Sequence, residues 1–344
     1  MTTGTLPPLT KKDFQTDQEV RWCPGCGDYA ILSAVQSVFP ELGIPREKFV
    51  IVSGIGCSSR FPYYMNTFGF HSIHGRAIAV ATGIKAIRPD LEVWVATGDG
   101  DALAIGGNHT IHMLRRNVGV KVLLFNNRIY GLTKGQYSPT SEFNKKTKST
   151  PYGTADRPFN PVSLAIGAEA TFVARGVDVF QPHLKEVLRQ AAAHKGSAFV
   201  EILQNCNIFN DGAWESLTEK EVRSDHVVYL EHGKPLIFGK NRDKGIRRDA
   251  NGDLEIVQLG NGSGFSEKDL IVHNAHHSRA AYAFHLSHME QHPGFPTPIG
   301  VFRSWDDLPR YEDVMAGQIS SITARMGKGD LAELLRTGDT WEVK

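Results

Sequence analysis

The chain has 344 residues, and 38 Lys and Arg against 37 Asp and Glu give a formal net charge of +1. This balance excludes the basic surface of a nucleic-acid-binding or membrane-surface protein, so neither partner is expected. No apolar run approaches the roughly 18 residues of a membrane span, and residues 1–16 lack an apolar signal segment. We therefore expect a cytoplasmic protein with enough chain to bury a full core.

The chain begins with a polar stretch and a cysteine-bearing turn. Residues 1–20 predict an N-terminal arm that could reach a partner subunit. Residues 22–27 read WCPGCG, in which Pro24 and Gly25 favour a tight turn that points both sulfurs the same way. Apolar residues recur at helical spacing over 29–39, so a helix is predicted next.

A short apolar run at 49–52 predicts a buried parallel strand that ends in the glycine-rich sequence GIGCSS, residues 54–59. A dinucleotide-binding turn is a weak alternative, because Ser59 replaces the third glycine and an aromatic loop is expected over 61–70. We expect the turn to bring backbone N–H groups and Cys57 to the carboxyl edge of a sheet. His74 opens the next predicted helix, 75–87, and either faces that edge or is structural.

Two polar clusters follow neighbouring predicted strands. The sequence GDGD, residues 98–101, follows the strand predicted at 92–97, and Asn126-Asn127 follows the strand predicted at 120–125. A helix predicted over 106–117 connects them, and strand–helix–strand units make parallel strands with a right-handed crossover. Both clusters are therefore expected at the carboxyl edge, where open α/β sheets bind ligands.

The residue types at this edge suit a magnesium-bound diphosphate. Mg²⁺ prefers hard oxygen ligands, and Asp99 offers a carboxylate, Asn127 an amide oxygen and Ile129 a backbone carbonyl. Gly98 and Gly100 allow backbone N–H groups to approach a diphosphate. GDG, 25 intervening residues and then Asn-Asn resemble the thiamine diphosphate fingerprint. Either half alone would predict only a strand end or an Asn-rich turn.

A long polar loop follows, and loops of this length are usually functional or disordered. Lys134 lies a few residues after the proposed magnesium ligands, so it either meets an anionic substrate or is an exposed surface lysine. Helices are then predicted at 160–167 and 182–195, with strands at 171–175 and 197–203. Cys206 stands just past the second of these strands.

The sequence changes character after about residue 215. Residues 226–260 predict a charged hairpin with a turn at Asn251-Gly252. Residues 269–291 predict a polar or interfacial helix rather than a metal site, because the histidines are irregularly spaced. These histidines are His273, His276, His277, His285 and His288. Two short helices are predicted at 311–326 and 330–337.

Four cysteines come from three segments: Cys23, Cys26, Cys57 and Cys206. Four soft ligands suit a structural Zn²⁺ or a [4Fe–4S] cluster, and spacing alone does not separate the two. Structural zinc usually takes a second short cysteine pair, which is lacking here, so the cluster is favoured. A redox cluster beside thiamine diphosphate could also accept electrons.

As a set, these motifs resemble the β subunit of the 2-oxoacid:ferredoxin oxidoreductases. The matching segments span roughly 15–215 and are 22–27, 54–59, 71–76, 98–109, 126–136, 147–153 and Cys206. Residues 130–141 (YGLTKGQYSPTS) are similar to the branch that acts on 2-oxoglutarate rather than pyruvate. The part beyond residue 215 is also similar to the oxoglutarate type but carries fewer motifs.

The resemblance implies an α/β fold with a doubly wound, mostly parallel sheet, the diphosphate-binding half of the thiamine diphosphate fold. This domain would cover 21–215, and 216–344 would form a C-terminal extension for subunit contacts. An α subunit would supply the pyrimidine-binding half and its activating glutamate, for which this chain offers no compelling candidate. The chain alone is then inactive, and an α2β2 assembly would convert 2-oxoglutarate and coenzyme A to succinyl-CoA and CO₂, reducing ferredoxin.

The resemblance also implies roles for individual residues. Asp99, Asn127 and the Ile129 carbonyl would bind Mg²⁺, and the four cysteines would bind one [4Fe–4S] cluster. The thiamine diphosphate would be lined by Ile55, Gly56, Cys57, Ser58, His74, Gly100, Asp101, Gly131 and Leu132. His74 and Lys134 are the candidate catalytic residues, with Lys134 assigned to substrate recognition. Two alternatives remain: the same chemistry on pyruvate or another 2-oxoacid, and a non-oxidative thiamine diphosphate enzyme with a structural zinc.

Overall fold

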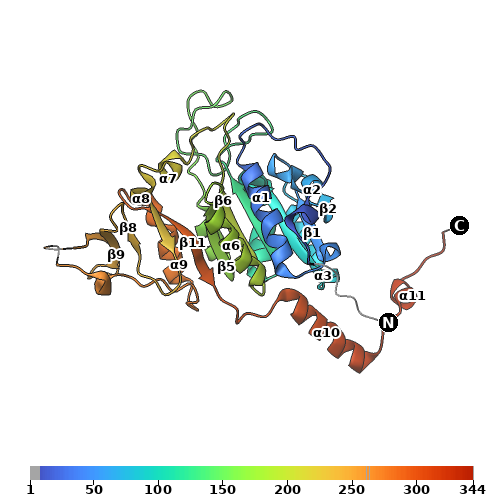
Figure 1. Cartoon of the computed structure of the whole chain (residues 1–344). Coiled ribbons are helices and arrows are strands. Elements are labelled where there is room, and N and C mark those ends of the chain that lie inside the picture. Colours follow the sequence, from blue (N-terminus) through green and yellow to red (C-terminus); the bar gives the residue numbers. More distant parts are fainter. Residues whose placement is uncertain (1–7, 261, 263, 344) are drawn as a thin grey trace.

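A computed structural model of the chain describes residues 8–260, 262 and 264–343 (Figure 1). Within these residues the main sheet has eight strands in the order β2-β1-β3-β4-β6-β5-β11-β7. Its strands are β1 (Phe49–Ser53), β2 (Phe68–His71), β3 (Glu92–Gly98), β4 (Val120–Asn126), β5 (Phe172–Val177), β6 (Ala198–Leu203), β7 (Val227–Leu230) and β11 (Thr297–Ser304). Strands β1 to β6 are paired in parallel, whereas β11 pairs antiparallel with β5. The predicted mostly parallel α/β sheet is confirmed.

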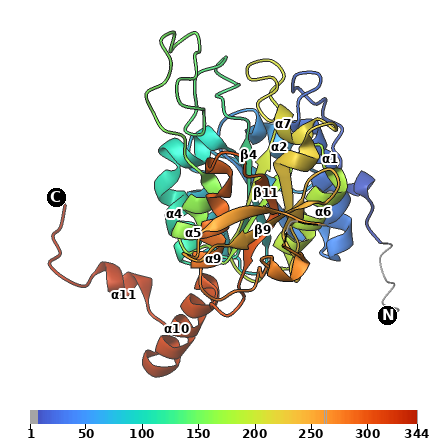
Figure 2. The same ribbon diagram turned by 90° about the vertical axis from the view of Figure 1, so that its left-hand side faces the viewer.

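Helices cover both faces of this sheet (Figure 2), with α1 and α6 on one side and α4, α5 and α9 on the other. The helices are α1 (Asp28–Val38), α2 (Phe61–Tyr64), α3 (Ala77–Ile87), α4 (Gly107–Arg115), α5 (Pro161–Gly167), α6 (Gln181–Ala193), α7 (Glu215–Thr218), α8 (Arg223–His226), α9 (Ala281–Ser287), α10 (Tyr311–Met326) and α11 (Leu331–Leu335). Parallel strands need helical crossovers, which is why both faces are covered.

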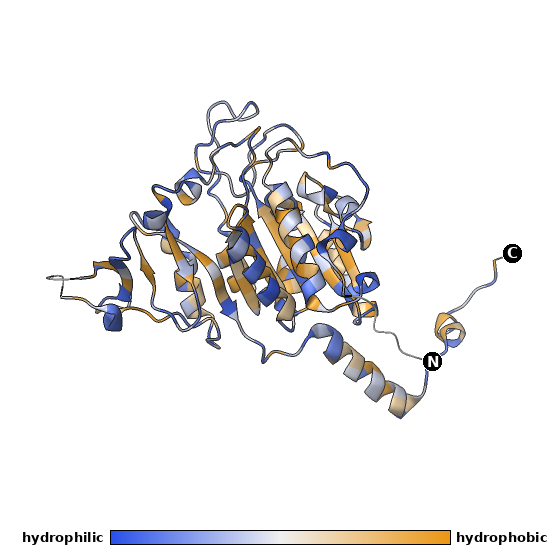
Figure 3. Cartoon of the chain, in the orientation of Figure 1, coloured by the Kyte–Doolittle hydropathy of each residue, from blue (hydrophilic) through white to orange (hydrophobic). Residues whose placement is uncertain are grey.

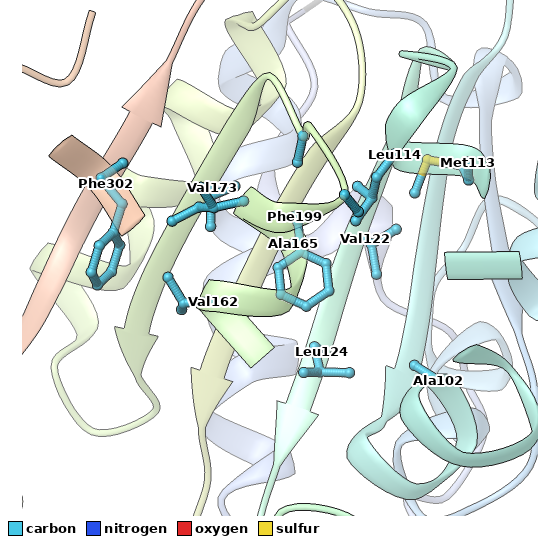
Figure 4. Packing of buried hydrophobic residues seen from close by; sticks show 14 of the residues in the cluster. Ala102, Met113, Leu114, Val122, Leu124, Val162, Ala165, Val173, Phe199 and Phe302 are labelled. Carbon is cyan, nitrogen blue, oxygen red and sulfur yellow. The ribbon is translucent and has the colours of Figure 1, made fainter. Parts of the chain in front are cut away.

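The strands of the main sheet are mostly hydrophobic, as their colour in Figure 3 shows, and their buried side chains belong to two separate core clusters. In β4, Val122 and Leu124 join the core under α4 and α5, whereas Leu123 and Phe125 join the core under α1 and α6. Figure 4 shows the first of these cores, in which Phe199 of β6 packs among aliphatic side chains. Burial on both faces fixes the strand register, because a slip of one residue would move the side chains of each face into the core on the other face.

Some residues beyond 215 belong to the main sheet, since β7 and β11 extend it. The predicted hairpin is confirmed: β9 (Lys244–Arg248) pairs antiparallel with β10 (Leu254–Gln258), and Gly252 in the turn has a φ of 91°. With β8 (Ile237–Phe238) they form a second, three-stranded sheet within the described part of the chain. The helix predicted at 311–326 is confirmed as α10, and it extends away from the body of the molecule (Figure 1).

Two expectations about local structure are wrong. The aromatic stretch 61–70 is not a loop, because it forms α2 and then enters β2, an edge strand parallel to β1. Residues 269–291 are not one helix: only Ala281–Ser287 is α-helical, flanked by short 3₁₀ turns and irregular chain. The stretch 61–70 contains a strand because β2 pairs with β1, and the local sequence does not reveal such pairing.

The N-terminal arm packs on its own subunit where the structure describes it. Phe14 is fully buried and meets Phe39 and Phe49 edge-on, with ring centroids 5.6 Å apart in both pairs. Residues 1–7 of the predicted arm lie outside the described residues. Among the residues described, no helix is long and apolar enough to span a bilayer.

Candidate active site at the carboxyl edge of the sheet

Four strand ends meet at one edge of the main sheet. The register is level across it: Ser53 of β1 pairs with Ala96 of β3, Gly98 with Phe125 of β4, and Asn126 with Leu203 of β6. The loops after these strands therefore emerge side by side, and they carry GIGCSS, GDGD, Asn126-Asn127 and Cys206. The edge predicted for these motifs from strand order is confirmed.

The first cavity at this edge, here called the Asp99 cavity, has a volume of about 110 Å³. Every residue that the sequence assigned to magnesium or thiamine diphosphate lies in its wall. They are Ile55, Gly56, Cys57, Ser58, His74, Asp99, Gly100, Asp101, Asn127, Ile129, Gly131 and Leu132. The loops after three strands thus line one cavity, together with the carboxylates of Asp99 and Asp101.

Asp99 is buried, and one of its carboxylate oxygens accepts hydrogen bonds from the hydroxyls of Ser138 and Thr140. Burial raises the pKa of Asp99 to about 6, although the two hydroxyls and nearby backbone N–H groups oppose the shift. A desolvated carboxylate oriented by two hydroxyls suits a hard cation, whose charge would favour the ionised form.

The Asn127 loop is shaped by its own side chain. The backbone N–H of Ile129 donates to Asn127 Oδ1 at 3.2 Å, which closes a local turn. The Tyr130 hydroxyl donates to the Gly100 carbonyl at 3.1 Å, which ties this loop to the GDG turn. A Cβ on Gly100 would lie 2.1 Å from the Tyr130 ring, so only glycine allows this approach.

A second cavity, here called the cysteine cavity, has a volume of about 260 Å³ and all four cysteines in its wall. It shares Asp28, Cys57, Asn127, Gly131 and Leu132 with the Asp99 cavity, so the two are immediate neighbours. A Cβ placed on Gly131 would lie 3.6 Å from Cys57 Sγ and 3.7 Å from Cys206 Sγ. Two sulfurs from different strand ends thus flank one glycine of the third loop.

Hydrogen bonds hold the cysteine segments together. Trp22 Nε1 donates to the Cys57 carbonyl at 2.7 Å, and the Gly27 N–H donates to the Asn205 carbonyl at 3.2 Å. Asn207 Nδ2 donates to the Pro24 carbonyl at 2.7 Å. The WCPGCG turn is therefore fixed to both of the other cysteine loops.

The thiols lie in surroundings that disfavour an uncompensated charge. Burial raises the pKa of Cys57 to about 12, and the neighbouring Asp28 adds to the shift. Burial and Asp28 raise the pKa of Cys26 as well. Such sulfurs remain protonated unless a cation takes the place of the protons, which is what a metal centre would do.

The structure separates the two candidate catalytic residues. His74 lies in the turn before α3 and lines the Asp99 cavity, where its Nδ1 is 2.6 Å from Asp101 Oδ1. Lys134 is exposed and lines the cysteine cavity instead, in a turn where its N–H donates to the Gly131 carbonyl at 3.0 Å. Lys134 is thus near the sulfurs rather than beside Asp99.

Three residues that sequence reasoning missed also contribute to the edge. Ser138 and Thr140 come from the long loop and bind Asp99, and their position in the polar YSPTS sequence was the available signal. Asp28 directly follows WCPGCG and lines both cavities. It is buried with one carboxylate oxygen unpartnered within the described residues, and burial raises its pKa to about 7.

The fold and the loops at the carboxyl edge of the main sheet indicate the class of protein. The family described as thiamine pyrophosphate enzyme, C-terminal TPP binding domain, matches residues 54–202, which carry the GIGCSS, GDGD and Asn126-Asn127 loops. The α/β sheet and this match place the protein in the class that has a thiamine pyrophosphate-binding fold.

Closer relatives define the family. The 2-oxoglutarate oxidoreductase subunit KorB of Mycobacterium tuberculosis is 54% identical over 341 residues, covering 98% of this chain and 90% of that protein. Subunit beta of 2-oxoacid:ferredoxin oxidoreductase 1 of Aeropyrum pernix is 50% identical over 198 residues, covering 58% of this chain and 62% of that protein. A solved 2-oxoglutarate:ferredoxin oxidoreductase from Magnetococcus marinus, with 2-oxoglutarate, coenzyme A and succinyl-CoA bound, matches with a TM-score of 0.74 and 32% identity over 98% of each chain. The chain therefore belongs to the family of β subunits of the 2-oxoacid:ferredoxin oxidoreductases.

Proposed function

We propose that the chain is the β subunit of an enzyme that oxidatively decarboxylates 2-oxoglutarate with coenzyme A. The products would be succinyl-CoA and CO₂, and two electrons would pass one at a time to ferredoxin. The observation that carries this proposal is the shared wall of the Asp99 cavity and the cysteine cavity. A site for decarboxylation chemistry and a site for an electron acceptor then lie beside each other.

The Asp99 cavity fits a magnesium-bound diphosphate. Asp99, the Asn127 amide oxygen and the Ile129 carbonyl would hold Mg²⁺, a hard cation that takes oxygen ligands. The turn from Ile55 to Ser58, together with Gly100, Gly131 and Leu132, would surround the phosphates. Thiamine diphosphate, when bound, supplies the electron sink that a 2-oxoacid needs to lose CO₂. His74 and Lys134 remain the candidate residues for contacts with the reacting groups.

The cysteine cavity fits one [4Fe–4S] cluster held by Cys23, Cys26, Cys57 and Cys206. A structural zinc needs four ligands that converge on a single ion at about 2.3 Å. Among the residues described, no three His, Cys, Asp or Glu side chains are gathered closely enough to hold one ion. A cluster instead accepts each thiolate at a different iron, so it suits sulfurs spread around a cavity.

The Asp99 cavity is too small for the whole coenzyme, since pockets that enclose a ligand of that size are usually about 300–1,000 Å³. An α subunit would complete the site and provide the activating glutamate. The β chain would therefore be inactive without it. An α2β2 assembly in the cytoplasm, where thiols stay reduced, is consistent with this arrangement. Coenzyme A and ferredoxin would approach the same edge.

The test is to purify the chain anaerobically together with the α subunit that binds it and to follow ferredoxin or viologen reduction with a panel of 2-oxoacids. The proposal expects turnover that requires 2-oxoglutarate and coenzyme A. Preference for pyruvate or a branched-chain 2-oxoacid would reassign the substrate but keep the chemistry. Turnover without any electron acceptor, or zinc in place of iron on elemental analysis, would support the non-oxidative alternative.

A further inference from the structure

Asp101 is among the residues that the resemblance assigns to the coenzyme, yet its carboxylate is already occupied by the protein. Its side chain is 3% exposed. Oδ1 accepts hydrogen bonds from the backbone N–H groups of Ile55 at 3.1 Å and Gly75 at 2.7 Å. Oδ2 accepts from the Thr97 hydroxyl at 2.8 Å. His74 adds a fourth contact at 2.6 Å, so both oxygens have partners.

These four contacts join three separate segments of the edge: the turn after β1, the turn before α3 and the end of β3. The approach is close, because a Cβ on Gly54 would lie 2.0 Å from Asp101 Oδ2. The carboxylate thus takes up backbone N–H groups that would otherwise be unsatisfied beside the cavity. It fixes the position of Ile55, which starts the turn proposed to surround the phosphates.

The contacts also fix the His74 ring. A carboxylate whose Oδ1 already accepts two backbone N–H groups serves as an acceptor, so His74 Nδ1 must carry the proton between them. The other ring nitrogen, Nε2, has no hydrogen-bond partner within the described residues, and His74 lines the Asp99 cavity. A carboxylate that selects the tautomer and orientation of a histidine is a common arrangement in sites that act through the second ring nitrogen.

Direct binding of the coenzyme by Asp101 is electrostatically unfavourable, because a second carboxylate beside a diphosphate repels it unless a cation lies between them. We propose that Asp101 is a positioning residue: it joins the two turns to the end of β3 and presents His74 Nε2 to the bound coenzyme or substrate. This inference rests on the proposed thiamine diphosphate function. Asp99 and Asp101, two residues apart, then have different roles.

The first test is Asp101→Asn in the complete complex, with the dissociation constant of Mg²⁺–thiamine diphosphate measured by calorimetry. The substitution removes a negative charge, so a residue that merely lines the cavity would leave anion binding unchanged or tighter. A positioning residue predicts weaker binding, by about 10- to 100-fold as for other residues that orient a ligand. Equal or tighter binding by the variant overturns the proposal.

The second test needs neither activity nor coenzyme. Histidine-ring ¹⁵N chemical shifts of the wild-type complex, with the His74 signals assigned by their loss in His74→Asn, should show neutral His74 protonated at Nδ1. Asp101→Asn should give a mixture of tautomers. A wild-type His74 protonated at Nε2 overturns the proposal even if the Asp101 variant fails to fold.

A double-mutant cycle then separates action through His74 from independent effects. If Asp101 acts partly through His74, the losses of Asp101→Asn and His74→Asn are less than additive in the double variant. Additive losses contradict that link. Failure of the wild type to bind thiamine diphosphate would instead refute the proposed function, which distinguishes the two conclusions.

Discussion

The cysteines and the C-terminal histidines of this chain make an instructive comparison. The four cysteines are spread from residue 23 to residue 206, yet all lie in the wall of one cavity. The five histidines of 269–291 are close in sequence, but their side chains have different hydrogen-bond partners. His273 Nε2 bonds the Val301 carbonyl at 2.8 Å, whereas His276 Nδ1 bonds the Ser304 carbonyl at 2.8 Å.

Strand order, rather than sequence proximity, thus brings the candidate ligands together. Cys57 and Cys206 follow β1 and β6, and the parallel sheet places those strand ends at one edge. The histidines lie mostly on irregular chain and one short helix, so no common edge collects them.

Asp99→Ala should abolish binding of Mg²⁺–thiamine diphosphate and bring turnover below detection, because it removes the carboxylate proposed to bind Mg²⁺ from the wall of the cavity. The iron content and the visible absorption of the cluster should remain, since Asp99 is not in the wall of the cysteine cavity. Calorimetry and anaerobic absorption spectroscopy check the two parts. The control is Asp90→Ala, which removes an exposed aspartate that forms surface ion pairs. Normal turnover by Asp99→Ala would refute the magnesium assignment.

Cys206→Ala should lose or destabilise the cluster and with it ferredoxin reduction, while coenzyme binding persists. His276→Ala is the matched control, because it removes a potential ligand from the histidine-rich region and should leave iron content unchanged. Iron analysis and the dithionite-bleachable absorption of both variants test the comparison directly. An unchanged absorption spectrum of Cys206→Ala, or loss of iron from His276→Ala, would contradict the proposed difference between the cysteines and the histidines.

Thr140→Val keeps the side-chain shape but removes a hydroxyl that orients Asp99. Loss of a group that orients a metal ligand typically weakens metal affinity by about 10- to 100-fold. We therefore expect a higher Mg²⁺ concentration for half-maximal activity, with little change in maximal rate. Thr147→Val, in the same loop but away from Asp99, should behave as wild type. A Thr140 variant with wild-type Mg²⁺ dependence would show that the hydroxyl has no part in metal binding.

His273 should make the C-terminal region less stable in acid. Burial lowers the pKa of His273 to about 4, although its bond to the Val301 carbonyl opposes the shift. The unfolded chain, with a histidine pKa near 6.5, binds more protons in this range, so stability falls as the pH drops from 7 to 5, by about 2 kcal/mol. Thermal unfolding of wild type and His273→Asn at both pH values measures the difference. An equal pH dependence in the variant would exclude His273 as its source.

Much of the fold was predictable because the strands are strongly apolar and the motifs follow them directly. The strands 120–125 and 197–203 and the helix 182–195 agree with β4, β6 and α6 to within about two residues. Strands β2, β7 and β11 were missed. Edge and antiparallel strands depend on their pairing partners for stability, so their local sequence gives a weaker signal.

By itself, the sequence determined the family, the strand-end motifs and which residues could serve as ligands, since residue type and spacing are local properties. Only the tertiary structure decided which of those residues meet. Ser138, Thr140 and Asp28 lie at the carboxyl edge of the sheet in the folded chain. Lys134 lines the cysteine cavity rather than the Asp99 cavity. The Asp101 carboxylate lies among four hydrogen-bond donors. The physical reason is that a buried polar group takes its partners from whatever the fold brings within hydrogen-bond distance, which can be far away in the chain.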